Sequence, residues 1–124
     1  MKLSAKEFDR IVHRAIDRIP SEIRQHLENI SISVQRRPSR KLLKEMGLSP
    51  GEPLLGLYQG VSLMERSVFE PPLFPDTVIL FQEPLESICT TPGELERQIE
   101  ITVVHEIAHF LGFSDEELTD LGYD

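Results

Sequence analysis

The stretch HEIAHFLGFSD, residues 105–115, decides how this chain folds and what chemistry it can support. His105 and His109 are four residues apart, which puts them one turn apart on the same face of a helix. Two imidazoles in that arrangement can bind one tetrahedral zinc ion, each through a nitrogen about 2.0–2.1 Å from the metal. The spacing therefore predicts a helix that carries a metal site.

A third ligand has to come from outside this helix, because a residue on its next turn would strain the tetrahedron. Gly112 has no Cβ and permits the left-handed turn by which the chain can leave the helix. Asp115 follows three residues later and can supply a carboxylate oxygen. Three protein ligands leave one position for water, as in catalytic zinc sites. Glu106 is then predicted to be the general base that takes a proton from this water.

The motif has to be weighed against chance. A lone histidine on a helix is more often a core or surface residue than a ligand, and H-E-x-x-H occurs by coincidence. The addition of Gly112 and Asp115 at the required spacing makes coincidence the weaker explanation. His13 and His26 have no ligand spacing to the motif, and we expect both at the surface. Imidazole and carboxylate ligands suit zinc, but they also accept cobalt, nickel or iron.

The flanking residues predict where the motif's helix begins and ends. Thr91 is a good N-cap, Pro92 suits the first helical position, and Glu94 is expected to complete a capping box. Gly112 ends the helix. A second capping box at residues 114–117 starts a short helix, with Asp115 in its first turn. The apolar side of the long helix consists of Leu95, Ile99, Thr102, Val103, Ile107, Ala108 and Leu111.

Upstream of the motif the chain alternates between helical and extended patterns. A capping box at residues 4–7 followed by apolar residues at helical spacing predicts an amphipathic helix that ends before Pro20. The remaining elements are expected as a short helical piece in 21–30, a half-buried strand in 30–35, a helical turn in 39–47, strands in 54–60 and 61–69, a proline-rich loop in 70–76 and a central strand in 77–81.

Length and composition limit the class of protein. The 124 residues, 40% of them apolar and 27% charged, predict one globular domain over residues 1–124. No apolar run reaches the roughly 18 residues that span a bilayer, and no secretory signal is recognisable at the N-terminus. We therefore expect a cytoplasmic protein without a membrane partner. Cys89 is the single cysteine, and we expect it to behave as a small, partly buried apolar residue.

The net charge of −8 is unevenly distributed. Residues 1–46 carry eleven Lys/Arg against six Asp/Glu, whereas residues 47–124 carry two against fifteen. The basic residues are spread along helical patterns, which is typical of a solvated face. The acidity around the motif favours cations near the site, and the overall acidity argues against nucleic acid as a partner.

The motif and two stretches upstream of it resemble a known protein family. HEIAHFLGFSD matches the H-E-x-x-H-x-x-G-x-x-D pattern of the Asp-zincins. The stretches LLGLYQGVSLMERS (54–67) and LFPDTVILFQEPLE (73–86) resemble the minimal zincin family of small bacterial zinc metallopeptidases. The resemblance covers most of residues 30–124. It implies an α+β zincin-like fold, with a small mixed, twisted sheet, a backing helix and an active-site helix.

The same resemblance implies roles for individual residues. His105, His109 and Asp115 match the zinc ligands of the family, and Glu106 matches its general base. The resemblance also implies that a strand edge within residues 55–68 receives an extended peptide by strand addition.

Two features depart from larger zincins. The chain has no methionine after Met64 to form a turn beneath the metal. Tyr123 is the only bulky polar residue near the end of the sequence, and we hypothesise that its ring or hydroxyl packs against the metal site; the alternative is that it only covers the core. The second departure is size. Without a C-terminal subdomain, only one wall of a substrate cleft is apparent from the sequence, and no residue can be named as the oxyanion donor.

The sequence thus predicts a zinc-dependent peptidase that hydrolyses peptide bonds with metal-activated water. The competing hypothesis is a non-catalytic zincin relative that binds a peptide or protein through the same cleft. The intact Glu106 favours the enzyme, because a binding module has no evident need for a base beside the metal. A second copy of the chain could also cover the exposed strand edge and form a homodimer.

Overall fold

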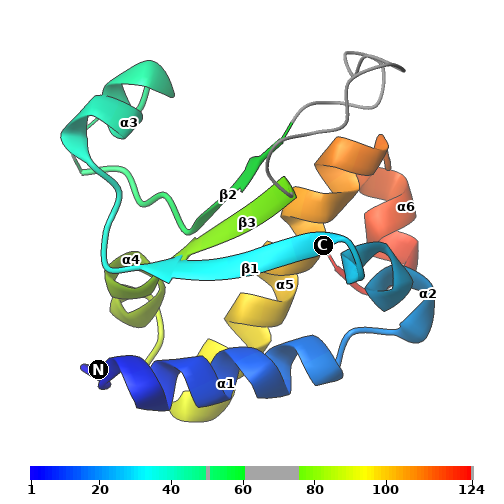
Figure 1. Ribbon diagram of the computed structural model, residues 1–124, viewed down its shortest axis with the longest axis horizontal. Coiled ribbons are helices and arrows are strands. Elements are labelled where there is room, and N and C mark those ends of the chain that lie inside the picture. The colour runs from blue at the N-terminus through cyan, green and yellow to red at the C-terminus, as the bar shows by residue number, and fades with distance from the viewer. Residues whose placement is uncertain (50, 61–75, 124) are drawn as a thin grey trace.

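The computed structural model describes residues 1–49, 51–60 and 76–123. Helices and strands are interspersed along the described part of the chain (Figure 1). The elements in order are α1 (Ala5–Asp17), α2 (Ser21–Arg24), the 3-10 helix η1 (Gln25–Leu27), β1 (Ile30–Gln35), α3 (Arg40–Glu45), β2 (Gly56–Gln59), β3 (Asp76–Phe81), α4 (Gln82–Ser87), α5 (Pro92–Leu111) and α6 (Asp115–Asp120).

The three described strands form one mixed sheet in the order β1-β3-β2. β1 pairs parallel to β3, with Ile30 opposite Asp76, whereas β2 pairs antiparallel to it, with Tyr58 opposite Val78. β3 is the central strand, and its last four residues are buried. The prediction of a central strand is therefore confirmed, although β3 begins one residue earlier, at Asp76.

The hydrophobic core lies between the sheet and the two longest helices. α1 and α5 pack against each other, and both lie on the same side of the sheet (Figure 1). The expected α+β fold with a small mixed sheet, a backing helix and a long motif helix is confirmed. The largest fully buried side chains are Phe8, Ile19, Val78, Leu80, Phe81, Leu85, Leu95, Ile99, Val103, Val104, Ile107 and Leu118.

Capping interactions fix the helix starts that the sequence predicts. Ser4 and Glu7 form the expected capping box of α1, and Ser114 and Glu117 form that of α6. Thr91 caps α5 by accepting the Glu94 N–H at 3.1 Å. The predicted capping box of α5 is wrong in one respect. The Glu94 carboxylate bonds the Thr90 N–H and hydroxyl, because Thr90 offers two donors just outside the helix.

Other local predictions have mixed outcomes. The strand expected in 54–60 is present as β2, and the turn expected in 39–47 is α3. The strand expected in 61–69 and nearly all of the loop expected in 70–76 lie outside the described residues. The periodicity does not predict α4, which is short and contains a proline. Cys89 is 6% exposed and belongs to the core, as expected of a small apolar residue.

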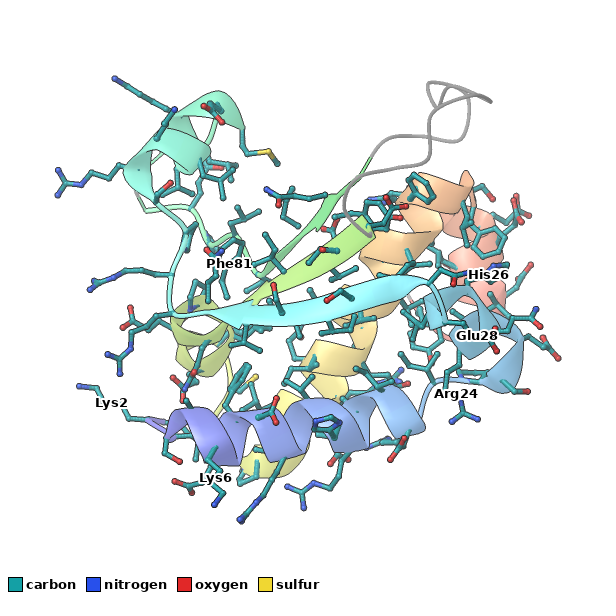
Figure 2. The ribbon with its side chains drawn as sticks, in the orientation of Figure 1. Lys2, Lys6, Arg24, His26, Glu28 and Phe81 are labelled. Atoms are coloured by element: carbon teal, nitrogen blue, oxygen red, sulfur yellow. The ribbon has the colours of Figure 1, made fainter. Side chains whose placement is uncertain are left out.

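The charged surface also follows the sequence. Lys2, Lys6 and Arg24 point away from the molecule in Figure 2, in agreement with a solvated basic face. His13 is exposed, with Asp9 3.3 Å away, and His26 is exposed on η1. Neither histidine belongs to the group of residues at the motif.

β2 approaches α5 closely at a glycine. A Cβ built on Gly56 would lie 2.8 Å from the Thr102 Cγ2 atom and 3.2 Å from the Ile79 carbonyl oxygen. The Thr102 side chain belongs to the buried part of α5, and a backbone carbonyl cannot turn aside. Gly56 therefore lets the edge strand lie against the helix that carries the motif.

We predict that Gly56→Ala destabilises the protein by about 1–3 kcal/mol, because the added methyl group overpacks the contact between β2 and α5. Urea denaturation measures the change in the free energy of unfolding. Gly51→Ala is the matched control, since a Cβ there meets no atom within 4 Å, and it should leave stability almost unchanged. Equal stability of the two variants would show that the close approach at Gly56 is not a constraint.

Candidate functional site

The site lies on the last turns of α5, where the helix emerges from the core. α5 ends at Leu111, its C-cap Gly112 has a left-handed φ of 81°, and the Phe113 N–H donates to the Ala108 carbonyl at 2.9 Å. The turn that the sequence predicts at Gly112 is thus present, for the predicted reason. Ile107 and Ala108 are buried, whereas His109 is exposed. Burial on one side of α5 fixes the direction in which its polar residues point.

His105 and His109 lie on the same face of α5, as predicted. Their ring centroids are 6.3 Å apart and the ring planes are tilted by 57°. Two imidazoles on one tetrahedral zinc would have centroids about 5 Å apart, as follows from the metal–nitrogen distance and the tetrahedral angle. The pair is therefore close to a shared metal position, but slightly too wide for it.

Glu106 connects the motif to the edge strand. Its Oε2 accepts a hydrogen bond from the Tyr58 N–H of β2 at 3.2 Å. Burial raises the pKa of the Glu106 carboxyl, and this rise is opposed by the Tyr58 hydrogen bond and by the nearby His109 and His105. A half-buried carboxylate with a raised pKa is a better proton acceptor than one in water.

Tyr58 forms a wall beside Glu106. Its ring stacks on that of Phe110, with centroids 4.4 Å apart and planes tilted by 15°. Its hydroxyl donates to the Asp76 Oδ2 at 2.6 Å. The two aromatic rings join β2 to the end of α5, so the strand edge and the motif are held together by side-chain contacts as well as by the backbone.

His105 is held by a residue far along the chain. Its Nε2 lies 2.7 Å from the carbonyl oxygen of Tyr123. The Tyr123 ring is 3% exposed and belongs to the core, and its hydroxyl donates to the Glu100 Oε2 at 2.7 Å. Burial and the Glu100 carboxylate raise the pKa of the Tyr123 phenol to about 12. Tyr123 thus reaches the motif through its backbone, while its ring covers the core.

Asp115 does not complete a three-residue metal group with the two histidines. It is exposed in the first turn of α6, directly after the turn at Gly112. Within residues 1–49, 51–60 and 76–123, no three His, Cys, Asp or Glu side chains converge as a metal-binding group. The donor types at the motif fit zinc, but in this arrangement their atoms do not fit it, and His105 is turned toward Tyr123.

Sequence reasoning missed three residues of this site. Tyr58 and Phe110 carry no motif, and their contact depends on how β2 lies against α5. Glu100 could have been noticed in the sequence, because it adjoins Ile99 on the predicted apolar side of the helix. In the structure it is 3% exposed. A carboxylate at such a position requires a buried partner.

Comparison with known proteins agrees with the fold. Residues 27–123 match the family of zincin-like metallopeptidases, and the chain belongs to this family. A solved structure of a conserved hypothetical protein from Thermus thermophilus is similar, with a TM-score of 0.54 and 17% sequence identity over 98% of this chain and 100% of that chain. At this identity the likeness concerns the fold alone. A search of curated proteins found no match.

Among the described residues, no helix is both long enough and apolar enough to cross a bilayer.

We predict that Glu106→Gln stabilises the metal-free protein more at pH 7 than at pH 4. Because burial raises the pKa of Glu106 in the folded state, its contribution to stability is present below the ordinary pKa of a glutamate and is lost as the pH rises through the raised value. Glutamine removes this loss and can still accept the Tyr58 N–H. Thermal unfolding in the presence of a chelator measures the difference, and an effect independent of pH would contradict the assigned cause.

Proposed function

We propose that this zincin-family protein is a metal-dependent peptidase whose site lies between α5 and the edge of β2. One observation carries the proposal: the Glu106 carboxylate of the motif is hydrogen-bonded to the Tyr58 N–H of the edge strand. A general base is useful to a peptidase only beside the backbone of its substrate. An extended peptide along the β2 edge would have its backbone there.

Some backbone N–H and C=O groups of β2 point away from β3, which is what the addition of another strand requires. The Phe81 N–H donates to the Leu55 carbonyl at 3.0 Å, so the backbone carbonyl of Leu55 points toward β3. Alternation along the strand then turns the backbone groups of Gly56 and Tyr58 away from β3. No described strand pairs with that side of β2. A peptide or protein substrate would form hydrogen bonds with Gly56, beside the Tyr58 N–H that Glu106 accepts.

His105, His109 and Asp115 are the residues that would hold the metal, with zinc as the first candidate. When bound, zinc would polarise the scissile carbonyl and lower the pKa of a water molecule. Imidazole and carboxylate donors suit this ion. The ligands have to rearrange from the described positions, because the imidazole of His105 is engaged with Tyr123 and Asp115 is exposed on α6.

Glu106 would move the proton during hydrolysis. The oxygen of water adds to the carbonyl carbon of the substrate, and the carboxylate of Glu106 accepts the proton that this oxygen loses. When the carbon–nitrogen bond breaks, Glu106 returns the proton to the leaving amine. Burial raises the pKa of the carboxyl, which favours its acceptance of the proton from water. Tyr58 would help to aim the carboxylate, since its N–H bonds one of the two oxygens.

A non-catalytic peptide-binding protein is the second candidate. The observation that favours it is the absence of a converged three-residue metal group among the described residues. In such a protein the β2 edge and the stacked Tyr58 and Phe110 rings would bind a peptide or a second copy of the chain. Glu106 would then be a hydrogen-bond acceptor for the edge strand and would not transfer protons.

The first experiment is a measurement of metal content by mass spectrometry after zinc titration and desalting. We predict about one zinc per chain for the wild type and a loss of at least tenfold in affinity for His109→Ala and Asp115→Ala. His13→Ala is the matched control, because His13 is exposed on α1 and lies outside the motif. Equal retention of zinc by all four proteins would place the metal elsewhere and contradict the proposed ligands.

The second measurement separates enzyme from binder. We predict that the zinc-loaded wild type cleaves members of a mixed peptide library, and that Glu106→Gln retains zinc but loses at least a hundredfold in turnover, as expected for removal of a general base. Peptides cleaved equally by wild type and Glu106→Gln would exclude Glu106 as the base. Binding of peptides without cleavage by either protein would support the second candidate.

A further inference from the structure

The segment Gly122–Tyr123 lies against the motif in a defined conformation. Gly122 has a left-handed φ of 89°, which turns the chain back after α6. The Tyr123 N–H donates to the Leu118 carbonyl at 2.8 Å. The Tyr123 carbonyl oxygen is then 2.7 Å from the His105 Nε2. The turn at Gly122 therefore places the Tyr123 carbonyl oxygen, a hydrogen-bond acceptor, beside His105, a predicted metal ligand.

This contact determines where the imidazole of His105 carries its proton. A carbonyl oxygen can only accept a hydrogen bond, so Nε2 has to be the donor. In the neutral ring the lone pair is then on Nδ1, and Nε2 has none to give to a metal. While the segment is seated, one of the two nitrogens of His105 is closed to metal binding.

A buried charge network anchors the segment. The Glu100 carboxylate, 3% exposed, accepts the Tyr123 hydroxyl at 2.7 Å and an Arg97 N–H at 2.8 Å. Arg97 also donates to the Gly122 carbonyl at 3.0 Å, and its guanidinium carbon lies 5.3 Å from the centre of the Tyr123 ring. Arg18, directly after α1, lies 3.3 Å from the other Glu100 oxygen, within ion-pair distance but without hydrogen-bond geometry.

The seated segment and the metal site are in conflict. With His105 Nε2 bonded to Tyr123, the rings of His105 and His109 are 6.3 Å apart, wider than the about 5 Å of two imidazoles on one zinc. In the same arrangement no three-residue metal group is formed by the described residues. In this same arrangement the segment engages the Nε2 of His105.

We propose that Gly122–Tyr123 is an autoinhibitory latch on the metal site. In the latched state the Tyr123 carbonyl oxygen accepts the hydrogen bond of the His105 Nε2, on the side where a metal would bind this nitrogen. Release of the segment from Glu100 and Arg97 frees Nε2, so that His105 can turn toward His109 and bind a divalent cation together with it. The proposal rests on the proposed function in one respect, which is that the motif takes a metal.

Two variants loosen the latch without touching a proposed ligand. Tyr123→Phe keeps the buried ring and removes its hydrogen bond to Glu100. Arg97→Ala removes the hydrogen bond to the Gly122 carbonyl and one partner of Glu100, and no apolar side chain of the core is changed. Leu121→Ala is the control for the segment, because that side chain is exposed. Arg14→Ala is the charge-matched control for Arg97→Ala, since Arg14 is exposed and pairs with Glu96.

The first readout is zinc affinity, measured by competition with a chromophoric chelator. We expect both loosened variants to bind zinc about two- to tenfold more tightly than the wild type, which corresponds to the loss of one hydrogen bond that opposes binding. Both controls should remain within about twofold of the wild type. Weaker binding by the loosened variants would mean that the segment supports the ligand, and equal binding would mean that it does not act on the site. Either result overturns the latch and leaves the peptidase proposal intact.

The second readout is the tautomer of His105, followed by nitrogen-15 NMR of the imidazoles. We expect the metal-free wild type to carry the proton on Nε2, and zinc to remove that Nε2–H signal. Persistence of the signal in the zinc-loaded protein would show that metal and segment coexist, and would overturn the latch. Absence of zinc binding in the wild type and in both loosened variants would overturn the latch and the metal-dependent function together.

Discussion

The burial of α5 is the constraint on which the rest of this structure depends. Leu95, Ile99, Val103 and Ile107 are fully buried along one side of the helix, against α1 and the sheet. The helix can neither rotate nor slide without exposing this row. Every motif residue on its last turns is therefore directed by the core, and the chemistry of the site depends on hydrophobic packing several turns away.

The same packing determines the wall opposite the motif. Gly56 allows β2 to lie against Thr102, and this contact brings the Tyr58 N–H within hydrogen-bond distance of Glu106. The carboxylate is consequently half-buried between a helix and a strand edge, and burial raises its pKa. The position of the strand and the raised pKa of Glu106 are thus consequences of a single contact between two elements.

Glu100 imposes a second constraint that hydrophobic packing cannot satisfy. A buried carboxylate costs free energy unless charged and hydrogen-bonding partners surround it. Here the partners come from three parts of the fold: Arg18 after α1, Arg97 on α5 and Tyr123 after α6. The requirement to satisfy one charge therefore ties the 122–123 segment to α5 and brings its carbonyl to His105.

The sequence by itself determined what depends on near neighbours: the long helices with their caps, the turn at Gly112, the central strand, and the placement of His105 and His109 on one face. These follow from helical periodicity and backbone sterics, which act over a few residues. Only the tertiary structure decided the bond from Tyr58 to Glu106 and the bond from Tyr123 to His105. These contacts join residues up to 48 positions apart, and their formation depends on how buried faces pack rather than on any local pattern.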